Sequence, residues 1–101
     1  MLKLLYLLII TMLSQTVSDF ILHIYKNKFV TKKTQKFFWG MGYYSMVWRL
    51  RDDGIAFEDG VTQNNEKIWK LTKKGLDIAK LLFERQTLEN KIDGLLKAEV
   101  K

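Results

Sequence analysis

The sequence VTKKTQKFFWGMGYYSMVWRLRDDGI, residues 30–55, predicts two helices separated by a tight turn. Thr31 suits the N-cap of a short helix over residues 32–39, because its hydroxyl can accept a hydrogen bond from a free backbone N–H. The run Gly40-Met41-Gly42 then turns the chain, since glycine tolerates backbone angles that other residues avoid. A second helix follows, from residue 41 or 42 to residue 53. Two helices joined in this way form a helix-turn-helix.

After Gly54, which ends the second helix as a C′ glycine, the pattern changes from helical to extended. Residues 55–58 are expected to form one strand and residues 66–71 the returning strand, with turn residues between them. Thr72 then caps a last helix that runs to about residue 97. A minimal strand is also expected at residues 29–30.

Two further helices are expected before residue 30. Residues 2–13 are almost wholly apolar, and a helix of that length is about 20 Å long, too short for a hydrocarbon core of about 30 Å. We therefore expect this helix to pack against a subunit surface; the alternative is a signal peptide, since Lys3 precedes the apolar run. Ser18 is expected to cap the next helix, which ends near Lys28.

Composition and charge narrow the function. Seventeen Lys and Arg against eleven Asp and Glu give a net charge of +6, which suits a polyanionic partner, either nucleic acid or an anionic membrane. An ordinary lysine-rich soluble protein fits this charge equally well. The chain has no cysteine and one histidine, His23, so it lacks thiolate zinc ligands and cysteine nucleophiles. Its adjacent acidic pairs, at residues 52–53 and 58–59, do not come from separate elements as catalytic carboxylates do. We expect neither an enzyme nor a cofactor, metal or small-molecule ligand.

Two strings give the chain a family resemblance. RLRDDGI at residues 49–55 and WKLTKKG at residues 69–75, together with the glycine turn, make residues 19–82 resemble the winged-helix DNA-binding regulators, in particular small dimeric archaeal or viral members. In that family the corresponding strings often read RLEEDGL and YxLTxKG. The resemblance implies a mainly α fold with a small β-hairpin wing, here extended by an N-terminal helix and a long C-terminal helix. Residues 1–101 would form a single domain, with residues 18–75 as its winged-helix core.

The resemblance also implies a partner, a location and a mode of binding. A winged-helix regulator of transcription would bind double-stranded DNA in the cytoplasm, associated with the nucleoid or, for a viral protein, in its host. Helix 42–53 would enter the major groove, and the wing, residues 58–67, would contact the adjacent backbone or minor groove. No membrane partner is expected.

Helical spacing divides the residues of the helix over residues 42–53 between core and DNA. Tyr43, Met46, Val47 and Leu50 predict a face toward the core. The base-reading candidates are the remaining residues Gly42, Tyr44, Ser45, Trp48, Arg49 and Arg51. The phosphate-binding candidates are Lys28, Lys32, Lys33 and Lys36, and those of the wing are Gln63, Asn64, Asn65 and Lys67.

Each of these residues also has a plainer interpretation. The lysines can form an ordinary solvated face, and Trp48 can pack against the wing or the first helices instead of DNA. Phe38, Trp39 and Trp69 are expected to lie in the core, and His23 is expected to be structural or on the surface.

The last helix predicts self-association. Ile78, Leu81, Arg85, Leu88, Ile92 and Leu95 recur at spacings of three and four, which is a heptad pattern with one charged departure. At about 37 Å the helix is longer than so small a domain needs. We expect a homodimer with an interface formed by Leu4, Leu5, Leu8, Ile9, Leu81, Leu88, Ile92 and Leu95. The alternative is that both terminal helices pack within one subunit.

Three functions remain open at this level. The first is a dimeric, sequence-specific transcription regulator. The second is an architectural protein that coats DNA without sequence preference, and the third is a winged-helix module that binds another protein. Asp52 and Asp53, close to the expected recognition helix, leave room for the third.

Overall fold

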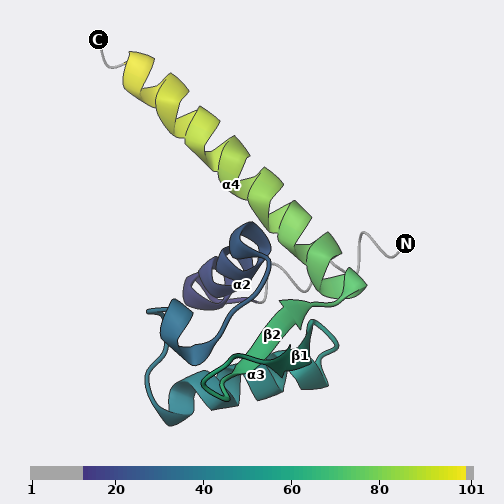
Figure 1. The fold of residues 1–101 in the computed structure, drawn as a ribbon. Coiled ribbons are helices and arrows are strands. Elements are labelled where there is room, and N and C mark those ends of the chain that lie inside the picture. Colours follow the sequence, from purple (N-terminus) through teal and green to yellow (C-terminus); the bar gives the residue numbers. More distant parts are fainter. Residues whose placement is uncertain (1–12, 100–101) are drawn as a thin grey trace.

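The computed structural model of the protein describes residues 13–99, which form three α-helices, a short 3-10 helix and a two-stranded antiparallel sheet (Figure 1). In chain order the elements are α2 (Gln15–Asn27), η1 (Lys32–Thr34), α3 (Met41–Asp52), β1 (Ala56–Val61), β2 (Lys67–Leu71) and α4 (Lys73–Glu99). The expected mainly helical fold with a small hairpin is confirmed at this level. The helix expected over residues 2–13, with interface candidates Leu4, Leu5, Leu8 and Ile9, lies outside the described residues except for Leu13.

Helix α2 begins earlier than the sequence suggested. Its N-cap is Ser14, whose hydroxyl accepts a hydrogen bond from the backbone N–H of Val17 at 3.2 Å. The expectation that Ser18 is the cap is wrong, because Ser18 lies inside the helix and is buried. The helix ends at Asn27, and its C-cap, Lys28, adopts a left-handed backbone with φ of 74°.

The prediction of a helix over residues 32–39 is wrong beyond the first turn. Thr31 is its N-cap as expected, but only the 3-10 turn η1 follows. The buried Gln35 then redirects the chain, since its Oε1 accepts hydrogen bonds from the backbone N–H groups of Phe37 and Phe38, both at 2.9 Å. Its Nε2 donates to the carbonyl oxygens of Lys32 at 3.2 Å and Phe38 at 2.9 Å. One side chain thus satisfies backbone groups that an α-helix would have paired.

The hairpin pairs Ala56 with Leu71 and Glu58 with Trp69, with an irregularity between Glu58 and Val61. The minimal strand expected at residues 29–30 is present as a bridge, in which Val30 and Trp69 exchange backbone hydrogen bonds of 2.9 Å.

Trp39 and Trp69 differ in how deeply they are buried. Trp69 is buried in the core, as expected. The prediction that Trp39 packs in the core is wrong, because its side chain is 81% exposed. Because the helical turn ends at Gln35, Phe38 is directed toward the core and packs edge-on against Phe20, with ring centroids 5.1 Å apart. Trp39, the next residue, is left outside.

The segments RLRDDGI and WKLTKKG meet where the hairpin joins α4. The Thr72 hydroxyl donates to the carbonyl oxygen of Gly54 and accepts from the N–H of Gly75, which confirms Thr72 as the cap of α4. Gly54 has φ of 74°, as a C′ glycine requires. A Cβ on Gly75 would lie 2.1 Å from the carbonyl oxygen of Ile55, so only glycine fits there. These residues of the two strings therefore join α3, the hairpin and α4.

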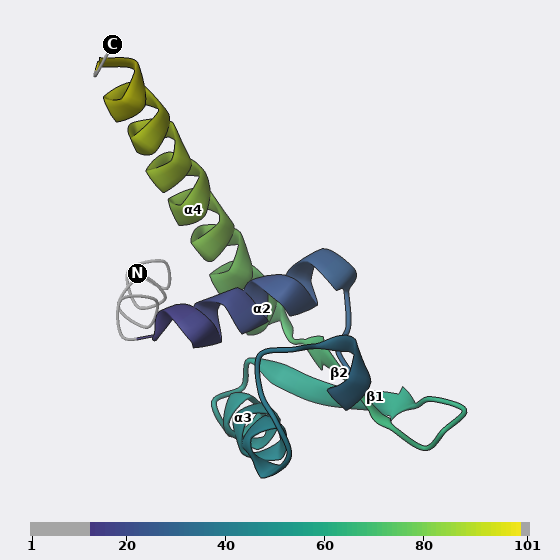
Figure 2. The same cartoon turned by 90° about the vertical axis from the view of Figure 1, so that its left-hand side faces the viewer.

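Helix α4 has two different halves. Ile78, Ala79 and Leu82, in its first half, are buried, and this half packs against α2. The second half extends beyond the body of the molecule, as Figures 1 and 2 show. In both views α3 and the hairpin lie at the end of the molecule opposite the C-terminal end of α4.

Candidate nucleic-acid interface

The core face of α3 is the one that the sequence predicted. Tyr43, Val47 and Leu50 are buried, and Met46 is half-buried against the core. This packing fixes the rotation of the helix, so the opposite face must point to solvent.

The centre of that exposed face carries two large apolar side chains between polar ones. Met41, Ser45, Trp48 and Asp52 follow one another at spacings of four, three and four, which places them in one stripe along the helix. Met41 is 65% and Trp48 39% exposed. Sequence reasoning found Ser45 and Trp48 but missed Met41 and Asp52, although the same helical spacing could have identified both.

Tyr44 and Trp48 stack on each other along this face. Their ring centroids lie 5.8 Å apart with an interplanar angle of 29°. Nζ of Lys32 lies 5.1 Å from the centroid of the Tyr44 ring, a cation–π distance. A predicted phosphate ligand and two predicted base-reading residues are therefore brought together.

A hollow of about 210 Å³ lies between α3 and the hairpin. Its lining includes Lys32 from η1, Tyr44 from α3, and Asn65 and Lys67 from the hairpin. All three predicted groups, the base-reading helix, the phosphate-binding lysines and the wing, thus contribute to one surface. Glu66 also lines the hollow, with Oε1 3.8 Å from Nζ of Lys33.

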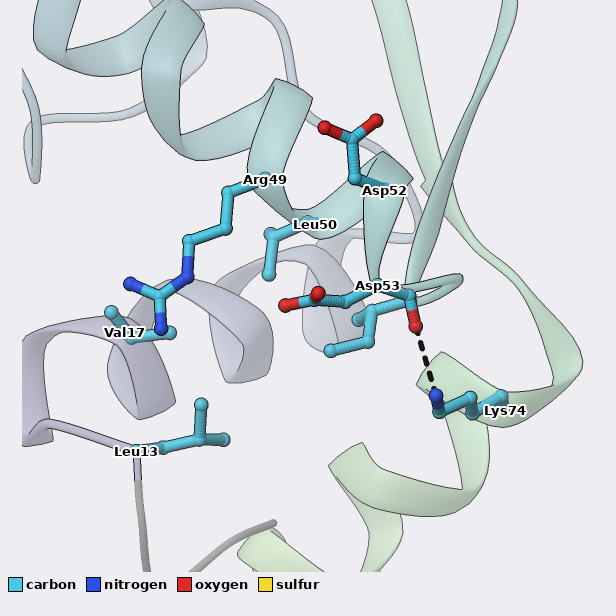
Figure 3. A pocket seen from close by; sticks show the side chains of 8 residues that line it. Leu13, Val17, Arg49, Leu50, Asp52, Asp53 and Lys74 are labelled. Atoms are coloured by element: carbon cyan, nitrogen blue, oxygen red, sulfur yellow. Dashed lines mark hydrogen bonds between the residues drawn. The ribbon is translucent and has the colours of Figure 1, made fainter.

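The two predicted arginines lie on opposite flanks of α3. Arg51 is seven residues from Tyr44 and so shares its flank, where its guanidinium contacts the Asp52 carboxylate at 3.2 Å. Arg49 shares the other flank with Gly42. Figure 3 shows its side chain extending toward α2 and Val17. There it lines a separate cavity of about 510 Å³, together with Leu13, Val17, Leu50, Asp52, Asp53, Ile55 and Lys74.

The remaining predicted lysines and wing residues lie at the surface. Lys28, Lys33 and Lys36 are exposed, as are Gln63, Asn64 and Asn65 in the loop that projects from the hairpin (Figure 2). Lys67 is paired with Glu58 at 3.0 Å, and Lys70 is paired with Asp59, so the cations of the hairpin are balanced locally. Within the described part of the chain, no ion pair involves Lys32 or Lys36.

Two further residues are structural. The Tyr43 hydroxyl is buried and has no hydrogen-bond partner among residues 13–99. Burial, with smaller contributions from Tyr44 and Glu66, raises the pKa of Tyr43 well above its ordinary value of 10.0. His23 on α2 packs edge-on against Phe37, with ring centroids 5.5 Å apart.

Residues 13–99 contain neither a grouped set of metal ligands nor a membrane-spanning helix. No three His, Asp or Glu side chains within residues 13–99 are grouped so that they could hold a metal ion. Nor is any helix of this part of the chain both long and apolar enough to cross a membrane.

Comparison with known protein families, curated proteins and solved structures finds no match to this chain. Its function must therefore be inferred from its own residues and their arrangement.

Proposed function

We propose that the protein is a winged-helix DNA-binding regulator that places α3 in the major groove of double-stranded DNA. The order of its elements supports this proposal: α2, the bridge at Val30, α3, a hairpin whose second strand pairs with Val30, and then α4. The first helix of the helix-turn-helix is reduced to η1, and Gln35 holds the loop that leads into α3.

The observation that carries the proposal is the hollow between α3 and the hairpin. Lys32, Tyr44 and Asn65 offer cationic, hydroxyl and amide groups there, which is the chemistry that binds a sugar-phosphate backbone. Of the other charged groups in the lining, Lys67 is paired with Glu58 and Glu66 with Lys33. If one DNA strand followed this hollow, the neighbouring major groove would lie against the exposed stripe of α3. An α-helix is about 10–12 Å across and the major groove about 12 Å wide, so the two dimensions agree.

The test is duplex binding at increasing salt concentration. We expect the affinity to fall steeply with salt, and selection from random duplexes to return a preferred sequence. Lys32→Ala should lower the slope of log K against log salt by about 1, because one phosphate contact is lost. The matched control is Lys91→Ala, an exposed lysine in the second half of α4, which should leave the slope unchanged.

Equal effects of the two substitutions would contradict the proposed interface. A wild-type protein that binds no duplex at low salt would contradict DNA binding altogether.

A homodimer is part of the same proposal. Leu88, Ile92 and Leu95 in the second half of α4 are more than half exposed, whereas Ile78 is buried and Leu81 packs against its own core. The heptad is therefore divided between the subunit's own core and a free apolar seam. Ile at the a position and Leu at the d positions favour pairing of two helices, so we propose that a second copy covers this seam.

One observation favours a second candidate, a module that binds another protein. Trp39 and Met41 are large, apolar and exposed at the start of α3, and exposed apolar patches often mark protein interfaces. This function would be favoured if the protein bound no nucleic acid and its associations did not depend on salt.

A further inference from the structure

In the proposed complex the exposed stripe of α3, with Met41 and Trp48 beside Ser45 and Asp52, would face a groove whose chemistry is almost entirely polar. Base pairs present donors and acceptors in the major groove, and the thymine C5-methyl is the one apolar group there. Met41 and Trp48 lie in the centre of the exposed face of α3, where contact with base edges would be closest. Apolar side chains against the polar edges of G·C pairs would remove water without replacing its hydrogen bonds.

The cations that usually read guanine lie outside the central stripe of α3. Arg51 bonds to the carboxylate of Asp52, and Arg49 lies on the other flank of the helix and extends toward α2 (Figure 3). An arginine reads guanine by pairing with O6 and N7 at the same time, which requires a free guanidinium aimed into the groove. Arg51 shares its guanidinium with Asp52, and Arg49 lies on the flank that faces α2, so neither is aimed from the centre of the exposed face.

The aromatic part of the stripe is fixed before any ligand binds. Trp48 stacks on Tyr44, and Lys32 lies against the Tyr44 ring. A side chain that is already held in place loses little conformational entropy on binding. The indole is thus a rigid apolar surface beside the hollow that we assign to the phosphate backbone.

We infer that α3 selects A·T-rich duplex DNA by contact of Met41 and Trp48 with thymine methyl groups. This inference rests on the proposed function, since it requires α3 to enter the major groove. It names the kind of sequence that the interface should prefer.

The test uses two pairs of DNA duplexes, and the members of each pair differ only in the C5-methyl group of the pyrimidine. Binding is measured on an A·T-rich duplex, on the same duplex with every thymine replaced by uracil, on a G·C duplex, and on that duplex with 5-methylcytosine. Burial of one methyl group is worth about fourfold in affinity, so loss of two should weaken binding about fifteenfold. We expect this loss from thymine to uracil, and a gain from cytosine to 5-methylcytosine, which places a methyl group in the same groove.

Trp48→Ala should reduce the ratio of thymine-duplex to uracil-duplex affinity to about fourfold, because the methyl contact of Met41 remains. The matched control is Phe57→Ala, because Phe57 on β1 is an aromatic residue of similar exposure, 41% against 39%, outside the proposed interface. Thermal unfolding of both variants establishes that they remain folded. Phe57→Ala should keep the wild-type ratio of thymine-duplex to uracil-duplex affinity.

The outcomes separate this inference from the proposed function. If the wild type binds thymine and uracil duplexes equally, methyl reading is wrong while DNA binding stands. If Trp48→Ala keeps the wild-type ratio, the assignment to Trp48 is wrong. If no duplex is bound, the proposed function fails, and this inference fails with it.

Discussion

At the scale of single residues, the buried hydroxyl of Tyr43 has a stability consequence. It has no hydrogen-bond partner among the described residues, and a buried polar group without one costs about 1–3 kcal/mol. Tyr43→Phe should therefore raise the free energy of unfolding by about 1 kcal/mol at neutral pH, as measured by urea denaturation. A loss of stability would mean that the hydroxyl has a partner, such as a buried water.

The same hydroxyl predicts a dependence on alkaline pH. The pKa of Tyr43 is raised in the folded protein, so the unfolded chain releases its proton first as the pH rises above 10.0. The stability contributed by the protonated form is complete below pH 10.0. Above it, this contribution falls by up to about 1.4 kcal/mol per pH unit until the folded group also titrates. Tyr43→Phe should lack this component, and parallel stability curves above pH 10.0 would contradict the explanation.

At the scale of elements, Gln35 decides the conformation of the loop before α3. Gln35→Ala removes the acceptor for the N–H groups of Phe37 and Phe38, and should lower the free energy of unfolding by about 2 kcal/mol. Lys36→Ala, at the exposed neighbouring position, should change it little. Equal effects in urea denaturation would show that the amide does not hold the loop.

The junction between the hairpin and α4 gives a prediction with its own opposite control. Gly75→Ala would place a Cβ against the Ile55 carbonyl and should destabilise the fold by roughly 3 kcal/mol or more. Gly94→Ala, in the same helix, meets nothing within 4 Å and should stabilise by up to about 1 kcal/mol. Thermal unfolding of the two variants should therefore shift in opposite directions.

At the scale of the whole molecule, the shape suits a dimer that leaves both α3 helices free. The second half of α4 extends away from α3 in both views, so pairing there would not cover the proposed interface (Figures 1 and 2). Ile92→Glu should give a folded monomer with weaker DNA binding, because two linked binding surfaces bind more tightly than one. Sedimentation velocity at micromolar concentration is the measurement, with the exposed neighbour Lys91→Glu as the control. A monomeric wild type would contradict the dimer.

Much of α3 and the hairpin follows from local rules. The bounds of α3, its core face of Tyr43, Val47 and Leu50, and the cap at Thr72 were all predictable. They depend on helical period and on hydrogen bonds within a few residues, and a linear sequence displays both.

Other features required the folded chain. Nothing local indicates that Gln35 would end the helix, that Trp39 would be exposed, or that Arg49 would extend toward α2. The meeting of RLRDDGI and WKLTKKG at one junction, and of Lys32, Tyr44 and the hairpin around one hollow, is likewise not visible in the sequence. These outcomes depend on contacts between residues far apart in the chain, which are set only when helices and hairpin pack together.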